Sequence, residues 1–257
     1  MKRQSWKAVY DCVTGISHLE KQIPCQDACR VIVSGDEDSN CLIIACADGA
    51  GSSRFADIGS TLACDQFVKL VQEFLTVGGA AESLTFDEIA SWYQNIHIEL
   101  ECRAQSLEVS IRELATTLLA GVIFEESAVF SQIGDGAIVI PDGENFRAVH
   151  WPQSGEYANT TNFVTGDNFL SDLAFERVDT PIDEVAVFTD GLERLILRYA
   201  DRTVHTPFLE PMLGVLRDNE TADKFFEPLR EFLESPAINS RTDDDKTLIL
   251  ATRRTKR

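Results

Sequence analysis

The sequence predicts an α+β domain in which β-sheets pack together and helices lie outside them. Short apolar runs separated by polar turns open the chain and fill its middle, a pattern typical of antiparallel strands. Between and after these runs, apolar residues recur at helical spacing. No repeat and no long linker interrupts the 257 residues, so we expect one domain, 1–257.

Three apolar runs in the first third predict strands, at 6–13, 28–34 and 41–47. The polar stretch 35–40 is expected to turn between the last two, as in a hairpin. Beyond it, apolar residues at helical spacing predict a helix from about residue 58 to the glycines at 78 and 79. A second amphipathic helix is expected over 86–107.

The middle of the chain predicts four more strands, at 114–124, 128–133, 137–140 and 145–151. Turns of two to four residues separate them, so consecutive strands should pair antiparallel. The polar segment 155–168 is expected to form a short surface flap. After it we expect a strand at 185–188, helices at 192–199, 206–216 and 222–232, and a closing strand at 247–250.

The composition is that of a soluble globular protein, 44% hydrophobic and 25% charged. A net charge of -19 argues against nucleic acid, which needs clustered Lys and Arg. No apolar run approaches the roughly 20 residues of a membrane helix, and the first residues lack a signal-peptide pattern. Seven cysteines, several in apolar patterns, fit a reduced cytoplasmic protein. Cys25, Cys29 and His18 match no closed zinc pattern.

Four segments place an aspartate at the edge of an apolar run, at 24–27, 47–51, 188–191 and 243–247. Each alone is more often a turn, a helix cap or a solvated loop. Two of them have the same form, an apolar strand that runs into Asp48-Gly49 or Asp190-Gly191. Carboxylates gathered in one place repel each other unless a cation lies among them. Aspartate oxygens suit Mg²⁺ or Mn²⁺, so we interpret the chain as a metal-dependent enzyme.

In this order, the segments resemble the motif series of the metal-dependent serine/threonine protein phosphatases of the 2C type, the PPM family, in its bacterial form. The matching segments are 14–18, 24–28, 47–52, 115–118, 133–136, 188–192 and 244–248. The resemblance implies a four-layer α-β-β-α sandwich of two mainly antiparallel sheets flanked by helices. It also implies hydrolysis of phosphoserine or phosphothreonine on a protein, in opposition to a serine/threonine kinase.

The resemblance further implies a site for two Mg²⁺ or Mn²⁺ ions. Carried onto this sequence, Asp48 bridges both ions and the Gly49 carbonyl binds one of them. Asp190 and Asp244 hold the other ion. Asp244 takes the ligand position when residues are counted back from the strand at 247–250, with Asp245 as the alternative.

Two more acidic residues match positions of the family. Asp27 helps to hold the site together, partly through metal-bound water, and Asp135 takes the position for a third metal. Two ions about 4 Å apart would lower the pKa of a shared water and so supply the hydroxide that attacks phosphorus in line.

The sequence departs from many members of the family at two places. Gln22 stands where an arginine often grips the substrate phosphate, and Ala50 stands where a histidine is proposed as general acid. Either Lys21 or His18 would have to compensate at the phosphate, or the ions would bind the phosphate unaided. His18 is also our candidate to replace the general acid, as an alternative to a metal-bound water.

These departures motivate a second hypothesis, a catalytically silent phosphatase fold that acts as a binding or regulatory module. Retention of all the expected aspartates favours the enzyme, because unneeded clustered carboxylates destabilise a fold. A haloacid-dehalogenase-type phosphatase is disfavoured, because that chemistry needs Asp-x-Asp and Phe188 occupies the nucleophile position.

Overall fold

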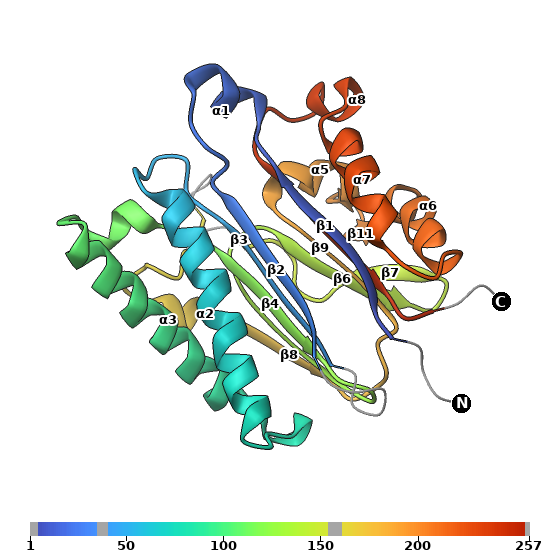
Figure 1. Ribbon diagram of the computed structural model, residues 1–257, viewed down its shortest axis with the longest axis horizontal. Helices are drawn as coiled ribbons and strands as arrows, with labels where there is room; N and C mark the ends of the chain where they lie inside the picture. The colour runs from blue at the N-terminus through green and yellow to red at the C-terminus, as the bar shows by residue number, and fades with distance from the viewer. Residues whose placement is uncertain (1–4, 35–40, 154–160, 255–257) are drawn as a thin grey trace.

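A computed structural model describes residues 5–34, 41–153 and 161–254. Two five-stranded sheets pack face to face between two layers of helices (Figure 1). The first sheet has the order β2-β3-β4-β5-β8 and the second the order β1-β12-β9-β6-β7. Every pairing within them is antiparallel. The predicted α-β-β-α sandwich is therefore confirmed.

The strands of the first sheet are β2 (Asp27–Ser34), β3 (Cys41–Asp48), β4 (Leu118–Ile123), β5 (Ala128–Ile133) and β8 (Ala174–Val178). Those of the second sheet are β1 (Lys7–Val13), β12 (Lys246–Thr252), β9 (Glu184–Phe188), β6 (Ala137–Asp142) and β7 (Asn145–Ala148). A separate two-stranded hairpin joins β10 (Leu197–Arg198) to β11 (Thr203–Val204).

Strand β3 has an almost continuously apolar sequence, and its surroundings explain why. Ile43 and Ala45 pack under helices, whereas Leu42 and Ile44 belong to the cluster between the two sheets. All four side chains are buried, because the strand is covered on both faces. The strand can therefore hold its last residue, Asp48, at the end of a rigid element.

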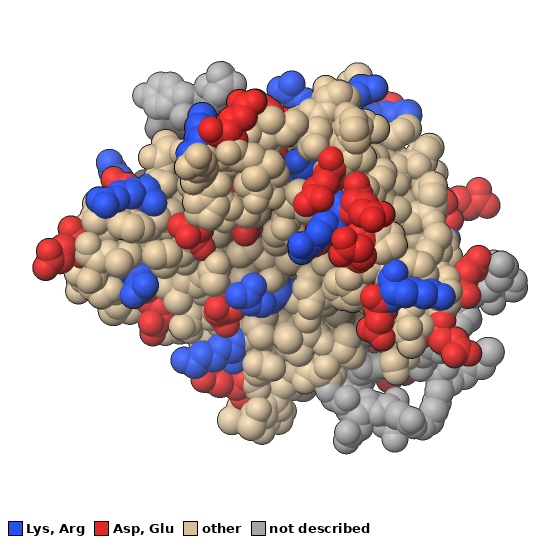
Figure 2. All heavy atoms as spheres, turned by 45° about the horizontal axis from the view of Figure 1, so that its top comes forward, with Lys and Arg blue, Asp and Glu red and all other residues tan. Residues whose placement is uncertain are grey.

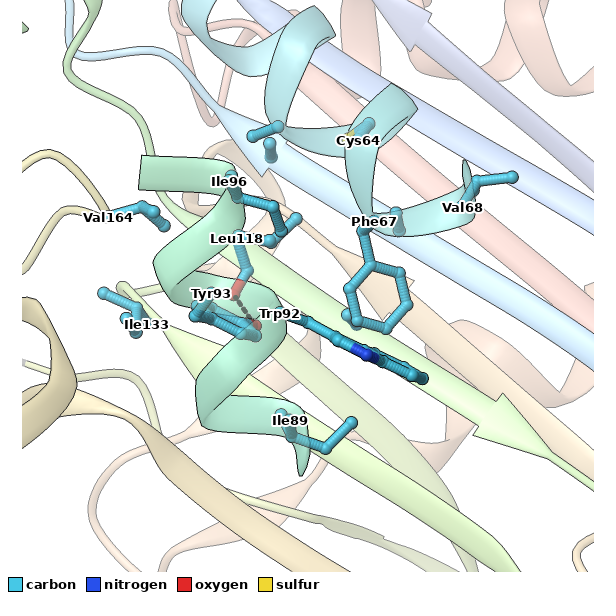
Figure 3. Packing of buried hydrophobic residues seen from close by; sticks show 14 of the residues in the cluster. Cys64, Phe67, Val68, Ile89, Trp92, Tyr93, Ile96, Leu118, Ile133 and Val164 are labelled. Carbon is cyan, nitrogen blue, oxygen red and sulfur yellow. Dashed lines mark hydrogen bonds between the residues drawn. The ribbon is translucent and has the colours of Figure 1, made fainter. Parts of the chain in front are cut away.

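Helices α2 (Ala56–Thr76) and α3 (Phe86–Ser106) cover the first sheet. In Figure 3, Phe67 of α2 lies edge-on against Trp92 of α3, with ring centroids 5.9 Å apart. Tyr93 reaches the sheet beneath, where its hydroxyl donates to the Leu118 carbonyl at 3.2 Å. This bond satisfies the buried hydroxyl and anchors α3 to β4.

The second sheet is covered by α6 (Thr206–Arg217) and α7 (Phe226–Leu233). The remaining helices are short: α1 (Ile16–Lys21), α4 (Phe169–Asp172), α5 (Glu193–Ile196) and α8 (Pro236–Asn239). Four 3₁₀ turns complete the elements of the described residues: η1 (Ala81–Ser83), η2 (Ile111–Leu114), η3 (Asp190–Leu192) and η4 (Asp223–Phe225).

Several predictions of local structure were wrong. The strand expected from 114 begins at Leu118, and the helix expected over 192–199 gives way to β10 after Ile196. Helix α1 and strand β8 were not predicted. The expected flap at 155–168 lies partly outside the described residues, and its described part, 161–168, contains no helix or strand.

The turn between β5 and β6 was also misread, since these strands do not pair with each other. They lie in different sheets, and Gly134, Asp135 and Gly136 carry the chain across. Gly134 has a φ of 124°, and a Cβ on Gly136 would lie 2.6 Å from the Phe188 carbonyl oxygen. Two glycines therefore permit the tight crossing, and Asp135 lies between the sheets' ends.

Candidate metal centre

The predicted aspartates gather at one end of the two sheets. Asp27 begins β2 and Asp48 ends β3, and the two residues are register partners. Asp190 follows β9, and the last residue of β9, Phe188, pairs with the first residue of β6. Asp135 lies two residues before the start of β6, in the crossing turn. This end of the strands lies near α1 and α5 in Figure 1.

Three of these carboxylates converge closely. One oxygen from each of Asp48, Asp135 and Asp190 lies within 4.8 Å of the others. Within the described ranges, no other group of acidic, histidine or cysteine side chains meets so tightly. The all-oxygen donor set suits Mg²⁺ or Mn²⁺.

Asp135 fits such a cation in a further respect. Its Oδ2 accepts a hydrogen bond from Thr161, whereas its Oδ1 is buried with no hydrogen-bond partner in the described part of the chain. A buried carboxylate oxygen without a donor is costly. A cation at this place would satisfy it.

Burial and mutual repulsion shift the acidity of the whole cluster. Burial raises the pKa of Asp48 far above its usual range, and the carboxylates of Asp27, Asp190 and Asp135 raise it further. Burial, then Asp135 and Asp244, raises the pKa of Asp190 to about 7. The pKa of Asp135 is raised by burial as well. Protons therefore compete with a cation for these oxygens.

Asp27 is held from the second sheet. Its Oδ2 accepts hydrogen bonds from the hydroxyls of Thr189, at 2.8 Å, and Thr247, at 2.7 Å. These threonines follow β9 and lie in β12, respectively. Burial raises the pKa of Asp27, and the Thr247 hydroxyl partly offsets the effect. The two hydroxyls tie the sheets together at the site.

The glycines after the two strand-end aspartates are required by close packing. A Cβ on Gly49 would lie 2.6 Å from the carbonyl oxygen of Ala56, at the start of α2. A Cβ on Gly191 would lie 2.0 Å from the carbonyl oxygen of Asp245. Each glycine lets a second segment of backbone approach the site.

Comparison with known proteins identifies the family. The model of the family described as protein phosphatase 2C matches residues 14–234. The chain belongs to the protein phosphatase 2C family. It is 35% identical over 252 residues to serine/threonine-protein phosphatase 3 of Escherichia coli, covering 96% of this chain and 98% of that protein. The family resemblance and the class of protein phosphatase are thus confirmed.

Solved structures agree with this fold. The serine/threonine phosphatase of Staphylococcus aureus superposes with a TM-score of 0.65 at 18% identity, covering 98% of this chain and 97% of that chain. PppA of Pseudomonas aeruginosa gives 0.61 at 14% identity, covering 97% and 98%. The 2C family depends on Mg²⁺ or Mn²⁺, and this member has an acidic cluster that could hold such an ion.

The two candidates in the 243–245 triplet have different surroundings in this 2C-type phosphatase. Asp245 is buried, and its oxygens accept from the backbone N–H groups of Gly15, at 2.7 Å, and Gln26, at 2.6 Å. Asp244 is exposed, and its Oδ1 accepts only the neighbouring backbone N–H, that of Asp245, among the bonds described. Asp245 is therefore engaged as a clamp. Asp244, which lies beyond the matched range, has an oxygen left for a ligand.

His18 lies beside this clamp rather than among the carboxylates. Its ring is buried, and its Nδ1 is 3.0 Å from Oδ2 of Asp245. Its Nε2 is 3.9 Å from the point where a Cβ on Gly51 would lie. His18 thus lies between Asp245 and the loop that follows Asp48. A catalytic role for His18 stays a prediction.

The two departures from the family pattern are visible in the structure. Gln22 is exposed and ends α1 with a left-handed φ of 56°. Ala50 donates its backbone N–H to the Ala115 carbonyl at 2.9 Å, so this loop is fixed by the backbone. Lys21, the proposed substitute for an arginine, is exposed.

Sequence reasoning missed Glu193, three residues after Asp190. Burial, followed by the carboxylates of Asp190 and Asp135, raises the pKa of Glu193 to about 7. Its Oε1 accepts a hydrogen bond from the Tyr199 hydroxyl. No pattern in the sequence marks this residue, because its place depends on how α5 turns after β9.

The surface around the site is not uniformly charged. Figure 2 turns the top of Figure 1 forward and shows acidic and basic side chains interspersed on this face. Among the described helices, none is long and apolar enough to cross a membrane.

Proposed function

We propose that this chain hydrolyses phosphoserine and phosphothreonine on proteins at a site for two Mg²⁺ or Mn²⁺ ions. The observation that carries the proposal is the convergence of Asp48, Asp135 and Asp190 at the ends of strands from both sheets. Such a group has no evident structural purpose, because its members raise one another's pKa values. Serine/threonine specificity follows the E. coli relative.

Different residues would bind the different ions. Asp48 and the Gly49 carbonyl would bind from β3, and Asp190 and Asp244 from the second sheet. Asp135, with its free Oδ1, would serve a third ion. Asp27 would steady the site through the two threonine hydroxyls that it accepts.

When bound, such ions lower the pKa of a coordinated water and neutralise the phosphoryl oxygens. The chain itself supplies rigidity. Asp245 fixes Gly15 and Gln26, so the segment that carries Asp27 cannot drift from the segment that carries Asp244. No side-chain nucleophile is needed, and the leaving group would take its proton from His18 or from a metal-bound water.

All seven cysteines are free thiols, which suits a reducing compartment, so we place the enzyme in the cytoplasm. Its substrates would then be products of a serine/threonine kinase.

The test is hydrolysis of p-nitrophenyl phosphate and of a phosphothreonine peptide, with Mn²⁺ and with EDTA. The parent should turn over both substrates only with metal, and Asp190→Asn should abolish turnover. Asp142→Asn, at the exposed end of β6, is the matched control and should keep full activity. Mn²⁺ binding by calorimetry without turnover would favour the silent binding module instead.

A further inference from the structure

A cluster of two aromatic rings and an arginine lies on the surface next to the carboxylates. The rings of Trp151 and Tyr199 meet edge to face, with centroids 5.5 Å apart. The guanidinium carbon of Arg202 lies 5.1 Å from the Trp151 ring centroid. Tyr199 is 52% exposed, and Arg202 is exposed as well.

Two short connections tie this cluster to the loops of the metal centre. On one side, the Tyr199 hydroxyl donates to Glu193, whose pKa is raised by burial and then by the carboxylates of Asp190 and Asp135. On the other side, Gln153 lies two residues after Trp151 and exchanges two hydrogen bonds with Gly134. Its N–H donates to the Gly134 carbonyl at 3.1 Å, and its Oε1 accepts from the Gly134 N–H at 2.9 Å.

Tyr199 and Arg202 contribute little to the packing of their own hairpin, whereas Trp151 is partly buried and packs against the core of the second sheet. Leu197 and Val204 are register partners in β10 and β11, and both are buried in the core under α6 and α7. Tyr199 and Arg202 lie in the turn between these strands, where half or more of an aromatic ring faces solvent. An exposed tyrosine ring that meets a partly buried tryptophan beside a reaction centre is typical of a surface that binds a partner.

The local charge indicates the kind of group that is bound. Residues 194–203 contain three arginines and one aspartate, in a chain whose net charge is -19. A basic segment next to an acidic metal centre attracts anions and orients them. Arginine with an aromatic ring also suits extended peptide, because the rings supply contact area at a low entropic cost.

We propose that Trp151, Tyr199 and Arg202 dock the polypeptide segment that flanks the phosphorylated residue, with a preference for acidic side chains in that segment. The inference rests on the proposed phosphatase function and assigns the recognition of substrate sequence to the β10–β11 hairpin. It also supplies a positive group near the site in a chain that has Gln22 in place of the family's arginine.

The test compares three substrates: p-nitrophenyl phosphate and two phosphothreonine peptides of equal length, one flanked by glutamates and one by lysines. The parent should prefer the glutamate peptide. Arg202→Glu should lower the ratio of kcat/KM for that peptide to kcat/KM for p-nitrophenyl phosphate by about five-fold, as expected for one exposed charge pair reversed. Tyr199→Ala should lower the same ratio, whereas Tyr199→Phe, which keeps the ring, should retain it.

Lys224→Glu is the matched control, because Lys224 is also a cation over an aromatic ring, that of Phe225 at 5.3 Å, in the layer that covers the second sheet. It should leave the ratio unchanged. An unchanged ratio in Arg202→Glu and Tyr199→Ala would overturn the docking role. So would an equal loss in Tyr199→Phe and Tyr199→Ala, which would assign the effect to the bond with Glu193. A parent without metal-dependent turnover of p-nitrophenyl phosphate would remove the phosphatase function itself.

Discussion

Replacing Asp190 by asparagine should stabilise the metal-free protein at high pH, although it abolishes the proposed activity. The pKa of Asp190 is raised from an ordinary 3.8 to about 7 in the folded state. Between these two values the folded state binds more protons than the unfolded state, so stability falls as the pH rises. Above pH 7 the whole penalty is present, and below pH 4 it is absent.

The magnitude follows from the same values. A pKa moved from 3.8 to about 7 corresponds to about 4 kcal/mol, since one pKa unit is worth about 1.4 kcal/mol. Water that reaches the half-buried carboxyl screens part of this penalty, and asparagine changes its hydrogen bond with Asp48. We therefore expect Asp190→Asn to gain about 2 kcal/mol at pH 8.

The assay is urea unfolding in EDTA at pH 4.5 and pH 8, followed by circular dichroism, with Asp142→Asn as the exposed control. Asp190→Asn should be close to the parent at pH 4.5 and more stable at pH 8. If the variant is less stable than the parent at pH 8, burial and the neighbouring carboxylates do not disfavour the ionised Asp190 in the metal-free fold. The reasoning on the site's electrostatics would then be refuted.

Three further predictions concern the same site. Thr247→Val removes the hydroxyl that donates to Asp27 at 2.7 Å, so it should lower the free energy of unfolding by about 1–3 kcal/mol and weaken Mn²⁺ binding measured by calorimetry. Unchanged stability would show that the Thr189 hydroxyl alone suffices for Asp27. Gly49→Ala should lower the free energy of unfolding by more than about 2 kcal/mol, because its Cβ would lie 2.6 Å from the Ala56 carbonyl oxygen. An unshifted melting curve would contradict this prediction. Mn²⁺ should raise the melting temperature more at pH 8 than at pH 5, because the carboxyls of Asp48 and Asp190 have raised pKa values and hold protons at low pH. An equal rise at both pH values would place the ion elsewhere.

The sequence correctly predicted the helices and strands whose hydrophobic pattern is strong. Strands that are buried on both faces, such as β3, read as continuous apolar runs, and α2 and α3 are long enough for helical periodicity to emerge. Strand β8 was missed because all five of its residues are only partly buried at the edge of the sheet, so its apolar signal is weak. Helix α1 has six residues, too few for a period.

The helix expected over 192–199 failed for a different reason. Leu192, Leu195 and Ile196 have helical spacing, but Leu197 pairs with Val204 in the β10–β11 hairpin. Tertiary pairing therefore overrode a local pattern. This hairpin carries Tyr199 at its turn, so the proposed docking surface could not be foreseen from periodicity.

Within the site, the sequence supplied the aspartates but not their neighbours. Asp48 and Asp190 stand out because each ends an apolar run and precedes glycine. The hydroxyls of Thr189 and Thr247 have no such signature, since their role depends on a contact with Asp27 across the two sheets. Asp135 was assigned to a third metal by its matching position alone, and its approach to within 4.8 Å of the carboxylates of Asp48 and Asp190 depends on the turn that joins the two sheets.

The packing between the sheets sets the separation of these carboxylates. Asp27 and Asp48 belong to the first sheet, Asp190 follows a strand of the second, and Asp135 lies in the turn that joins the two. The distance between the groups is therefore fixed by the apolar layer between the sheets, and Leu119 is in that layer, 3.1 Å from the point where a Cβ on Gly136 would lie. Close-packed interiors transmit small changes in side-chain volume. A side chain that contacts neither metal nor substrate can thus control how well the acidic residues converge, and the two-sheet architecture becomes part of the metal centre.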